Sequence, residues 1–181
     1  LRRRRAAFAP GRRITGGSFL AEPRTSLRIQ GLALTLIVIA LDQATKWWIL
    51  TDVMNPPRVI EALPFANIVL VWNRGVSFGL FNTGSDMGPW ILSAVAIGVA
   101  AILAAWLFRG ANRIVSWGIG LILGGALGNV IDRLIHGAVV DFIDLYVGTA
   151  HWPAFNVADS AICVGAGLLI LDSLFHQDKS S

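Results

Sequence analysis

The sequence predicts an all-α membrane protein with four transmembrane helices and a small strand-bearing cap on one membrane face. Apolar residues make up 55% of the 181 residues and charged residues only 14%, whereas about 25% of a typical soluble domain is charged. A helix of about 20 apolar residues crosses a hydrocarbon layer roughly 30 Å thick. Four segments fit this length, at residues 29–50, 89–108, 114–135 and 157–175.

An arginine-rich segment precedes the first predicted span. Eight of the 15 Lys and Arg residues lie between Arg2 and Arg28, a stretch that holds one acid, Glu22. Such an arm can bind nucleic acid, but here it adjoins a long apolar run, which favours anionic lipid headgroups as its partner. The run is longer than the apolar core of a usual signal peptide. We therefore expect residues 1–28 to be a disordered cytoplasmic tail, with no nucleic-acid partner.

The distribution of basic residues predicts the orientation. The tail, the short turn at 109–113 and the C-terminal tail at 176–181 hold eight, two and one Lys or Arg, respectively, of the 15 in the chain. Basic residues concentrate in cytoplasmic loops, so both termini should be cytoplasmic. The single expected domain, residues 29–175, then places its two longer connections on the exoplasmic side.

These two longer connections, at residues 51–88 and 136–156, form the predicted cap. Residues 58–63 and 66–72 are rich in β-branched side chains and are bounded by Asn-Pro-Pro and Leu-Pro-Phe turn signals, which predicts short strands. Tryptophans near the outer boundary predict an interfacial aromatic belt. They are Trp47, Trp48, Trp72, Trp90 and Trp152.

Polar residues inside the spans gather toward the predicted outer side. An ionisable side chain at a helix centre costs about 2.5–3.5 kcal/mol on insertion scales, so each one needs a reason. The inner halves of spans one, three and four carry no charge, which argues against a channel, a proton pump or a transporter. The outer halves hold Asp42, Lys46, Asn129, Asp132, Arg133, Asn156 and Asp159.

Each of these groups also has a purely structural interpretation. Asp42 and Lys46, at i and i+4, can form an ion pair that eases insertion. Asn156 can cap a helix, with Asp159 at the third helical position. The polar residues 129–133 can serve as helix-packing contacts. The sequence alone leaves these alternatives open, although their concentration in one leaflet favours a functional site.

The residue inventory restricts the possible chemistry. Ser77 has no histidine nearby in sequence, although a dyad with Lys46 stays open. The three histidines lack metalloprotease spacing, so we expect no metal. Cys163 lies in an apolar run and is interpreted as a buried packing residue. Two aspartates that share one proton can activate a water molecule and protonate a departing amine.

Five ordered motifs across residues 29–175 resemble those of lipoprotein signal peptidases, also called signal peptidase II. Ser77, where alanine is usual, and the basic tail depart from the family pattern. The motifs are DQATK at 42–46, WNRGVSFG at 72–79, GGALGNVIDR at 124–133, VVDF at 139–142 and FNVAD at 155–159.

The resemblance implies an intramembrane aspartyl endopeptidase of the bacterial inner membrane, with its site facing outward. Asp141 and Asp159 would be catalytic, and the substrate would be a prolipoprotein cleaved just before a diacylglyceryl-modified cysteine. No cofactor is implied, and we expect a monomer among membrane lipids. Residues implied to orient substrate or support the site are Asp42, Lys46, Asn73, Gly75, Asn129, Asp132, Arg133 and Asn156. The rival hypotheses are a membrane scaffold or transporter, and a lipid-modifying transferase.

Overall fold

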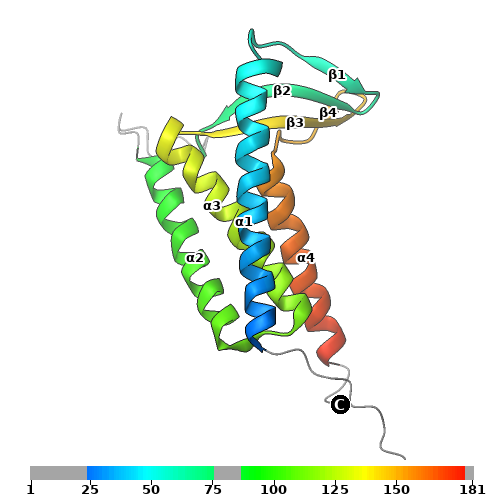
Figure 1. Ribbon diagram of the computed structural model, residues 1–181. Coiled ribbons are helices and arrows are strands. Elements are labelled where there is room, and N and C mark those ends of the chain that lie inside the picture. The colour runs from blue at the N-terminus through cyan, green and yellow to red at the C-terminus, as the bar shows by residue number, and fades with distance from the viewer. Residues whose placement is uncertain (1–23, 76–86, 178–181) are drawn as a thin grey trace, which may run out of the picture.

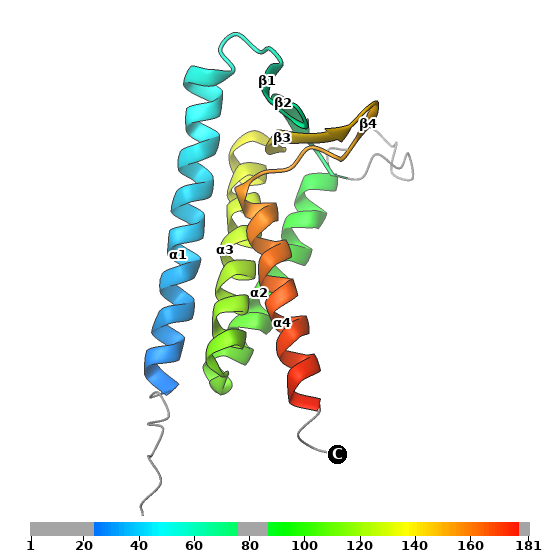
Figure 2. The same ribbon diagram turned by 90° about the vertical axis from the view of Figure 1, so that its right-hand side faces the viewer.

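The computed structural model describes residues 24–75 and 87–177. Four long helices run side by side, and a small antiparallel sheet lies across one end of them (Figures 1 and 2). All four helices are long and apolar enough to cross a membrane. The predicted fold class is therefore confirmed. The expected disorder of residues 1–23 lies outside the described residues.

The first helix starts earlier than the predicted span. Helix α1 covers Arg24–Trp48 and continues into a π-helical segment, Ile49–Val53. Residues 24–28, expected to be part of the tail, are thus helical, because a helix can extend past the apolar region into the headgroup layer. The other helices are α2 (Gly88–Gly110), α3 (Arg113–His136) and α4 (Val157–Gln177).

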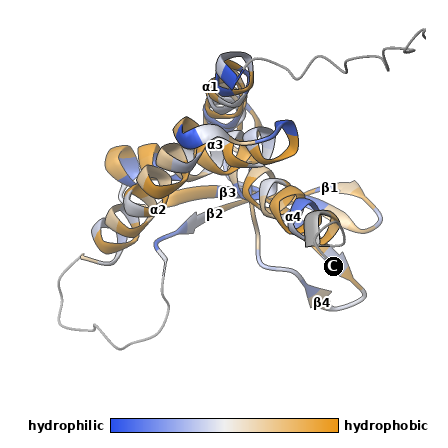
Figure 3. Cartoon of the chain, turned by 90° about the horizontal axis from the view of Figure 1, so that it is seen from below, coloured by the Kyte–Doolittle hydropathy of each residue, from blue (hydrophilic) through white to orange (hydrophobic). Residues whose placement is uncertain are grey.

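Helix α3 occupies the middle of the bundle, as the view along the helices shows (Figure 3). Its glycines permit close approach of its neighbours on both sides. A Cβ at Gly124 would lie 2.6 Å from Cβ of Val38 on α1, and a Cβ at Gly125 would collide with the carbonyl oxygen of Ala158 on α4. The glycine-rich motif therefore brings the polar outer ends of α1 and α4 against the same helix.

The bundle exposes apolar side chains on its outer surface, as expected for contact with lipid. Leu36, Ile102 and Ile170 are 68%, 71% and 61% exposed. Cys163 is also exposed, so the prediction that it packs in the core is wrong. Helix α4 turns Ala158, Ala161 and Gly165 toward α3, and Cys163 lies off this face.

The sheet has four strands in the order β1-β2-β3-β4, all neighbours antiparallel. Strands β1 (Ile60–Leu63) and β2 (Ala66–Asn73) confirm the two predicted strands. Strands β3 (Val139–Val147) and β4 (Ala150–His151) were not predicted individually. Val71 and Asn73 of β2 lie opposite Asp141 and Val139 of β3.

An apolar cluster fixes the sheet to the bundle. Ile49 begins the π-helical segment that follows α1, and Met54 comes directly after that segment. Both pack with Phe142 of β3, and the three residues are 3%, 2% and 6% exposed, respectively. Phe142 is the neighbour of Asp141 in the chain. The cluster therefore positions the middle of β3, where the predicted catalytic residue lies.

Candidate active site

The two aspartates of the predicted dyad come from different elements that meet where the sheet joins the bundle. Asp141 lies on β3, and Asp159 lies in the first turn of α4. Between them the chain folds back, and Phe155 pairs with Ile143 through backbone hydrogen bonds of 2.9 and 3.0 Å. This pairing returns the start of α4 to β3, close to Asp141.

Asn156 connects the two aspartates directly. Its Nδ2 donates to Oδ1 of Asp141 at 2.7 Å, and its backbone N donates to Oδ2 of Asp159 at 3.2 Å. Its Oδ1 accepts from the backbone N of Asp159 at 3.0 Å, which completes a helix cap. Asn156 is fully buried. The predicted cap is therefore present, and the same residue also organises the site.

Asn73 holds the other oxygen of Asp141. Its Nδ2 donates to Oδ2 of Asp141 at 2.9 Å, while its Oδ1 accepts from the backbone N of Gly75 at the same distance. Gly75 has a φ of 82°, a conformation that L side chains rarely adopt. The glycine thus permits the turn that orients the amide of Asn73.

The environment of Asp141 favours its protonated form. Its side chain is almost completely buried, at 1% residue exposure. Burial raises the pKa of Asp141 to about 6, with the charge of Asp159 adding to the rise and the hydrogen bond from Asn73 opposing it. Repulsion from Asp159 is the effect expected of two neighbouring carboxylates. Asp141 can therefore hold its proton up to about pH 6, well above the range of an ordinary aspartate.

Asn129 of α3 holds the second aspartate. Its Nδ2 donates to Oδ1 of Asp159 at 2.8 Å, and its Oδ1 accepts from Nδ2 of Asn156 and from Nζ of Lys46. Its backbone oxygen accepts a 3.3 Å bond from Nη1 of Arg133. Asn129 therefore connects the dyad to a cationic group on α1.

A second pair of aspartates lies near the dyad and shares one lysine. Nζ of Lys46 lies 2.8 Å from carboxylate oxygens of both Asp42 and Asp132. The three residues are at most 2% exposed. The predicted pairing of Asp42 with Lys46 is thus present and includes an additional acid from α3.

The buried aspartates also position the dyad through the backbone. Oδ1 of Asp42 accepts from the backbone N of Ala158 at 3.0 Å, and Oδ2 of Asp132 accepts from the backbone N of Val140 at the same distance. Ala158 and Val140 immediately precede Asp159 and Asp141. Each buried aspartate therefore holds the residue before one member of the dyad.

All ten predicted site residues thus belong to one connected region, although their catalytic roles stay predictions.

Gln43 belongs to the first motif but was not predicted as a site residue. Its Nε2 donates to Oδ1 of Asp132 at 2.9 Å and to Oδ2 of Asp42 at 3.2 Å. Its position between two site residues, Asp42 and Lys46, was the available signal. Ser77, the alternative nucleophile, lies outside the described residues.

Residues 24–75 and 87–177 contain no cluster of three His, Cys, Asp or Glu suited to a metal ion.

Three hydrogen-bonded polar side chains that the sequence did not predict lie farther along the sheet. Nδ1 of His151 lies 2.9 Å from Oδ1 of Asp144, and Nδ2 of Asn67 donates to Oδ2 of Asp144 at 3.0 Å. These three residues join β2, β3 and β4, and the hydrogen bond from Asn67, followed by that from His151, lowers the pKa of Asp144.

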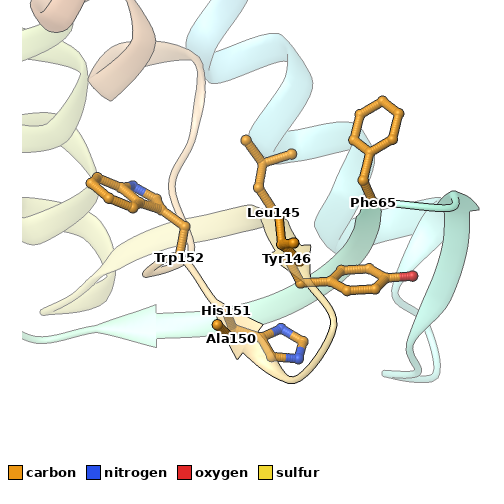
Figure 4. A pocket seen from close by; sticks show the side chains of 7 residues that line it. Phe65, Leu145, Tyr146, Ala150, His151 and Trp152 are labelled. Atoms are coloured by element: carbon orange, nitrogen blue, oxygen red, sulfur yellow. The ribbon is translucent and has the colours of Figure 1, made fainter.

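A cavity of about 540 Å³ lies beside this polar group, at the tip of the hairpin rather than at the dyad (Figure 4). Its lining consists of aromatic and aliphatic side chains from β3, β4 and the residues beside them, together with Phe65 from the turn between β1 and β2. The lining residues are Phe65, Leu145, Tyr146, Val147, Ala150, His151 and Trp152.

Comparison with known proteins agrees with the motif resemblance. The family model described as "Signal peptidase (SPase) II" matches residues 34–175. A lipoprotein signal peptidase of Methylorubrum extorquens (strain PA1) is 49% identical over 147 residues, 80% of this chain and 85% of that protein. One from Burkholderia mallei (strain SAVP1) is 50% identical over 145 residues, 79% of this chain and 86% of that protein.

Solved structures show the same fold. A bacterial membrane enzyme determined by the in meso method at 1.9 Å resolution has a TM-score of 0.70 and 32% identity, with 80% of this chain and 92% of that one covered. A second, determined at 2.3 Å, has the same TM-score and 31% identity, with 83% and 91% covered. The region matched by the family model, residues 34–175, includes every residue of the candidate active site.

Proposed function

The chain belongs to the signal peptidase II family, and on that premise we propose that it is an intramembrane aspartyl endopeptidase that cleaves prolipoprotein signal peptides. The cut would fall just before a cysteine that carries diacylglycerol. The observation that carries the proposal is that Asn156 bonds to both aspartates, donating from its side-chain Nδ2 to Asp141 and from its backbone N to Asp159. A protease of this family is neither a transporter nor a transferase, which disfavours both rival hypotheses.

The two aspartates would divide the acid and base roles. Asp159 lies in the first turn of α4, where the helix dipole favours a negative charge, so we assign it as the base that removes a proton from water. Asp141, whose pKa is raised to about 6, would hold the shared proton and donate it to the departing amine. Water would then add to the scissile carbonyl, and the peptide C–N bond would break as the amine gains its proton.

Amide and guanidinium groups around the dyad would orient the substrate. Asn73 and Asn129 fix the carboxylates from two sides. Arg133 donates to the backbone of Asn129 with one nitrogen, and its buried Nε has no hydrogen-bond partner within the described residues. We assign Arg133 to the peptide backbone or the developing oxyanion, because a donor aimed at that charge stabilises the transition state.

The site would face the exoplasmic side of a bacterial inner membrane. This orientation rests on the basic residues at the opposite end of the bundle, in the turn between α2 and α3 and in the N-terminal segment. Reporter fusions after Arg109 should give a cytoplasmic signal, and fusions after Thr149 an exoplasmic one. The reverse pattern would place the dyad on the wrong side for a lipoprotein processor.

The dyad itself is tested by isosteric substitution. Asp141→Asn and Asp159→Asn keep the side-chain size but remove the ionisable group, so each should lower kcat by about 10³-fold or more. The double variant should be little worse than either single variant, because the two residues act as one unit. Cleavage is measured by the mass of the products from a lipidated prolipoprotein and from its non-lipidated form.

Asp52→Asn provides a matched control, since Asp52 is an exposed aspartate at the end of α1. It should cleave at the wild-type rate. Substantial turnover by Asp141→Asn or Asp159→Asn, at equal abundance in the membrane, would exclude the aspartyl mechanism. Equal cleavage of the non-lipidated substrate would exclude the requirement for diacylglycerol.

A further inference from the structure

Four arginines lie on three helices at the end of the bundle opposite the dyad. Arg24 and Arg28 lie one turn apart on α1, Arg109 lies in the last turn of α2, and Arg113 begins α3. We call these four residues the arginine corner. The role proposed above does not use them, since the dyad lies at the other end of α3 and α4.

Close packing of the three helices holds the corner together (Figure 1). A Cβ at Gly110, in the turn after α2, would lie 3.5–3.6 Å from Cδ, Nε and Nη1 of Arg24. A Cβ at Gly31 on α1 would contact Leu107 of α2 and the backbone of Ser116 on α3. The start of α1 therefore lies against both the end of α2 and the start of α3.

The corner carries more positive than negative charge. Among residues 24–75 and 87–177, Asp172 of α4 is the one acid at this end, and its Oδ1 accepts a 2.8 Å hydrogen bond from Asn112. Nε of Arg28 is buried and has no hydrogen-bond partner in the described part of the chain. Because the four arginines outnumber this acid, the end of the bundle would attract an external anion.

An interfacial tryptophan places the corner at headgroup level. The guanidinium of Arg113 lies 5.4 Å from the ring centre of Trp117, whose Nε1 donates to Oε1 of Gln30 at 3.0 Å. Trp117 is 40% exposed. Tryptophan is enriched where hydrocarbon meets headgroups, with its polar edge toward the latter.

We propose that the arginine corner is a binding site for the headgroup of an anionic phospholipid. Guanidinium groups bind phosphate oxygens through paired, charge-assisted hydrogen bonds. Basic pockets between transmembrane helices are suited to anionic headgroups, and each Lys or Arg near an anionic surface contributes about 1 kcal/mol. The assignment to the cytoplasmic leaflet rests on the proposed orientation, whereas the binding itself does not.

Native mass spectrometry of the full-length protein in detergent tests this site. The protein is titrated with phosphatidylglycerol or with phosphatidylcholine of identical acyl chains. Wild type should bind phosphatidylglycerol about tenfold more tightly or better, because phosphatidylcholine carries a compensating positive charge. The double variant Arg24→Gln/Arg109→Gln should weaken phosphatidylglycerol binding about tenfold and leave phosphatidylcholine binding unchanged.

Arg58→Gln is the control, because Arg58 is an exposed arginine near the sheet at the other end of the molecule. It should bind both lipids like wild type. Equal binding of the two lipids by wild type overturns the proposal, and so does full preference in the double variant. Peptidase activity is measured on the same samples, and its absence with intact lipid preference would contradict the proposed function alone.

Discussion

Two pairs of buried aspartates lie within one site, and they differ in what balances their charge. Asp42 and Asp132 share the ammonium of Lys46 at 2.8 Å. Asp141 and Asp159 are held mainly by hydrogen bonds from the neutral side-chain amides of Asn73, Asn129 and Asn156. A nearby cation stabilises an ionised carboxylate, whereas neutral amides supply hydrogen bonds but no counter-charge. The first pair is therefore suited to structure and the second to acid–base chemistry.

The comparison also shows how the two pairs depend on each other. The charged pair binds the backbone at Ala158 and Val140, one residue before each member of the reactive pair. Ion pairing with Lys46 holds these two carboxylates in place, so each can accept its backbone hydrogen bond. Asp141 and Asp159 can then exchange a proton without also having to anchor the backbone at Ala158 and Val140.

Loss of Lys46 should produce the largest combined effect. Lys46→Met leaves Asp42 and Asp132 buried without a cation, and breaking such a pair costs about 3–5 kcal/mol. Thermal unfolding in detergent should show a large fall in Tm together with loss of cleavage. Asp141→Asn, which removes an equally buried carboxylate, should lose cleavage with an unchanged or raised Tm at about pH 8. Similar Tm losses in both variants would contradict the division into structural and reactive pairs.

The pH dependence of cleavage should identify the proton of the reactive pair. Because the pKa of Asp141 is about 6, it holds its proton below that pH and loses it above. The kcat/KM of wild type should therefore fall on the alkaline side with a midpoint of about 6. Asn73→Ala removes a hydrogen bond that lowers this pKa, so its midpoint should move to higher pH. A midpoint that moves downward would contradict the assignment of Asp141 as the acid.

The smallest effect is expected from substituting Asp144, which belongs to neither pair of buried aspartates. Its folded-state pKa is lowered from the ordinary aspartate value of 3.8, mainly by the hydrogen bond from Asn67. Its stabilising contribution is therefore present above pH 3.8 and is lost as pH falls through the folded-state pKa. Asp144→Asn should lower Tm by a few degrees at pH 7 and by less as the solution is acidified below the wild-type folded-state pKa. Cleavage at pH 7 should persist. A Tm difference that does not depend on pH would contradict an ionic role.

The sequence predicted the helices far better than their exact ends or the pairing of the strands. Hydropathy located all four helices, since about 20 apolar residues have few alternatives to a membrane span. The start of α1 at Arg24 was missed, because polar residues in the headgroup layer carry no apolar signal. Strand β3 was not distinguished from its loop, because a short apolar run does not reveal its partner strand.

The site shows the same limit. The motifs identified its members, including Asp132, for which a structural role was expected. The bonds from Ala158 to Asp42 and from Val140 to Asp132 join residues on separate elements, and no local pattern specifies them. Cys163 was placed in the core because its neighbours are apolar, yet in a membrane an apolar helix face can equally face lipid.

The cap formed by Asn156 has a consequence for biosynthesis. The residue that begins α4 is also the one that bonds to Asp141, so the final helix must start correctly before the catalytic pair exists. A nascent chain with three inserted spans carries Asp141 but neither Asn156 nor Asp159 in place. Under the proposed mechanism, the unfinished polypeptide would therefore be proteolytically silent, and activity would first arise when translation and insertion of the last span are complete.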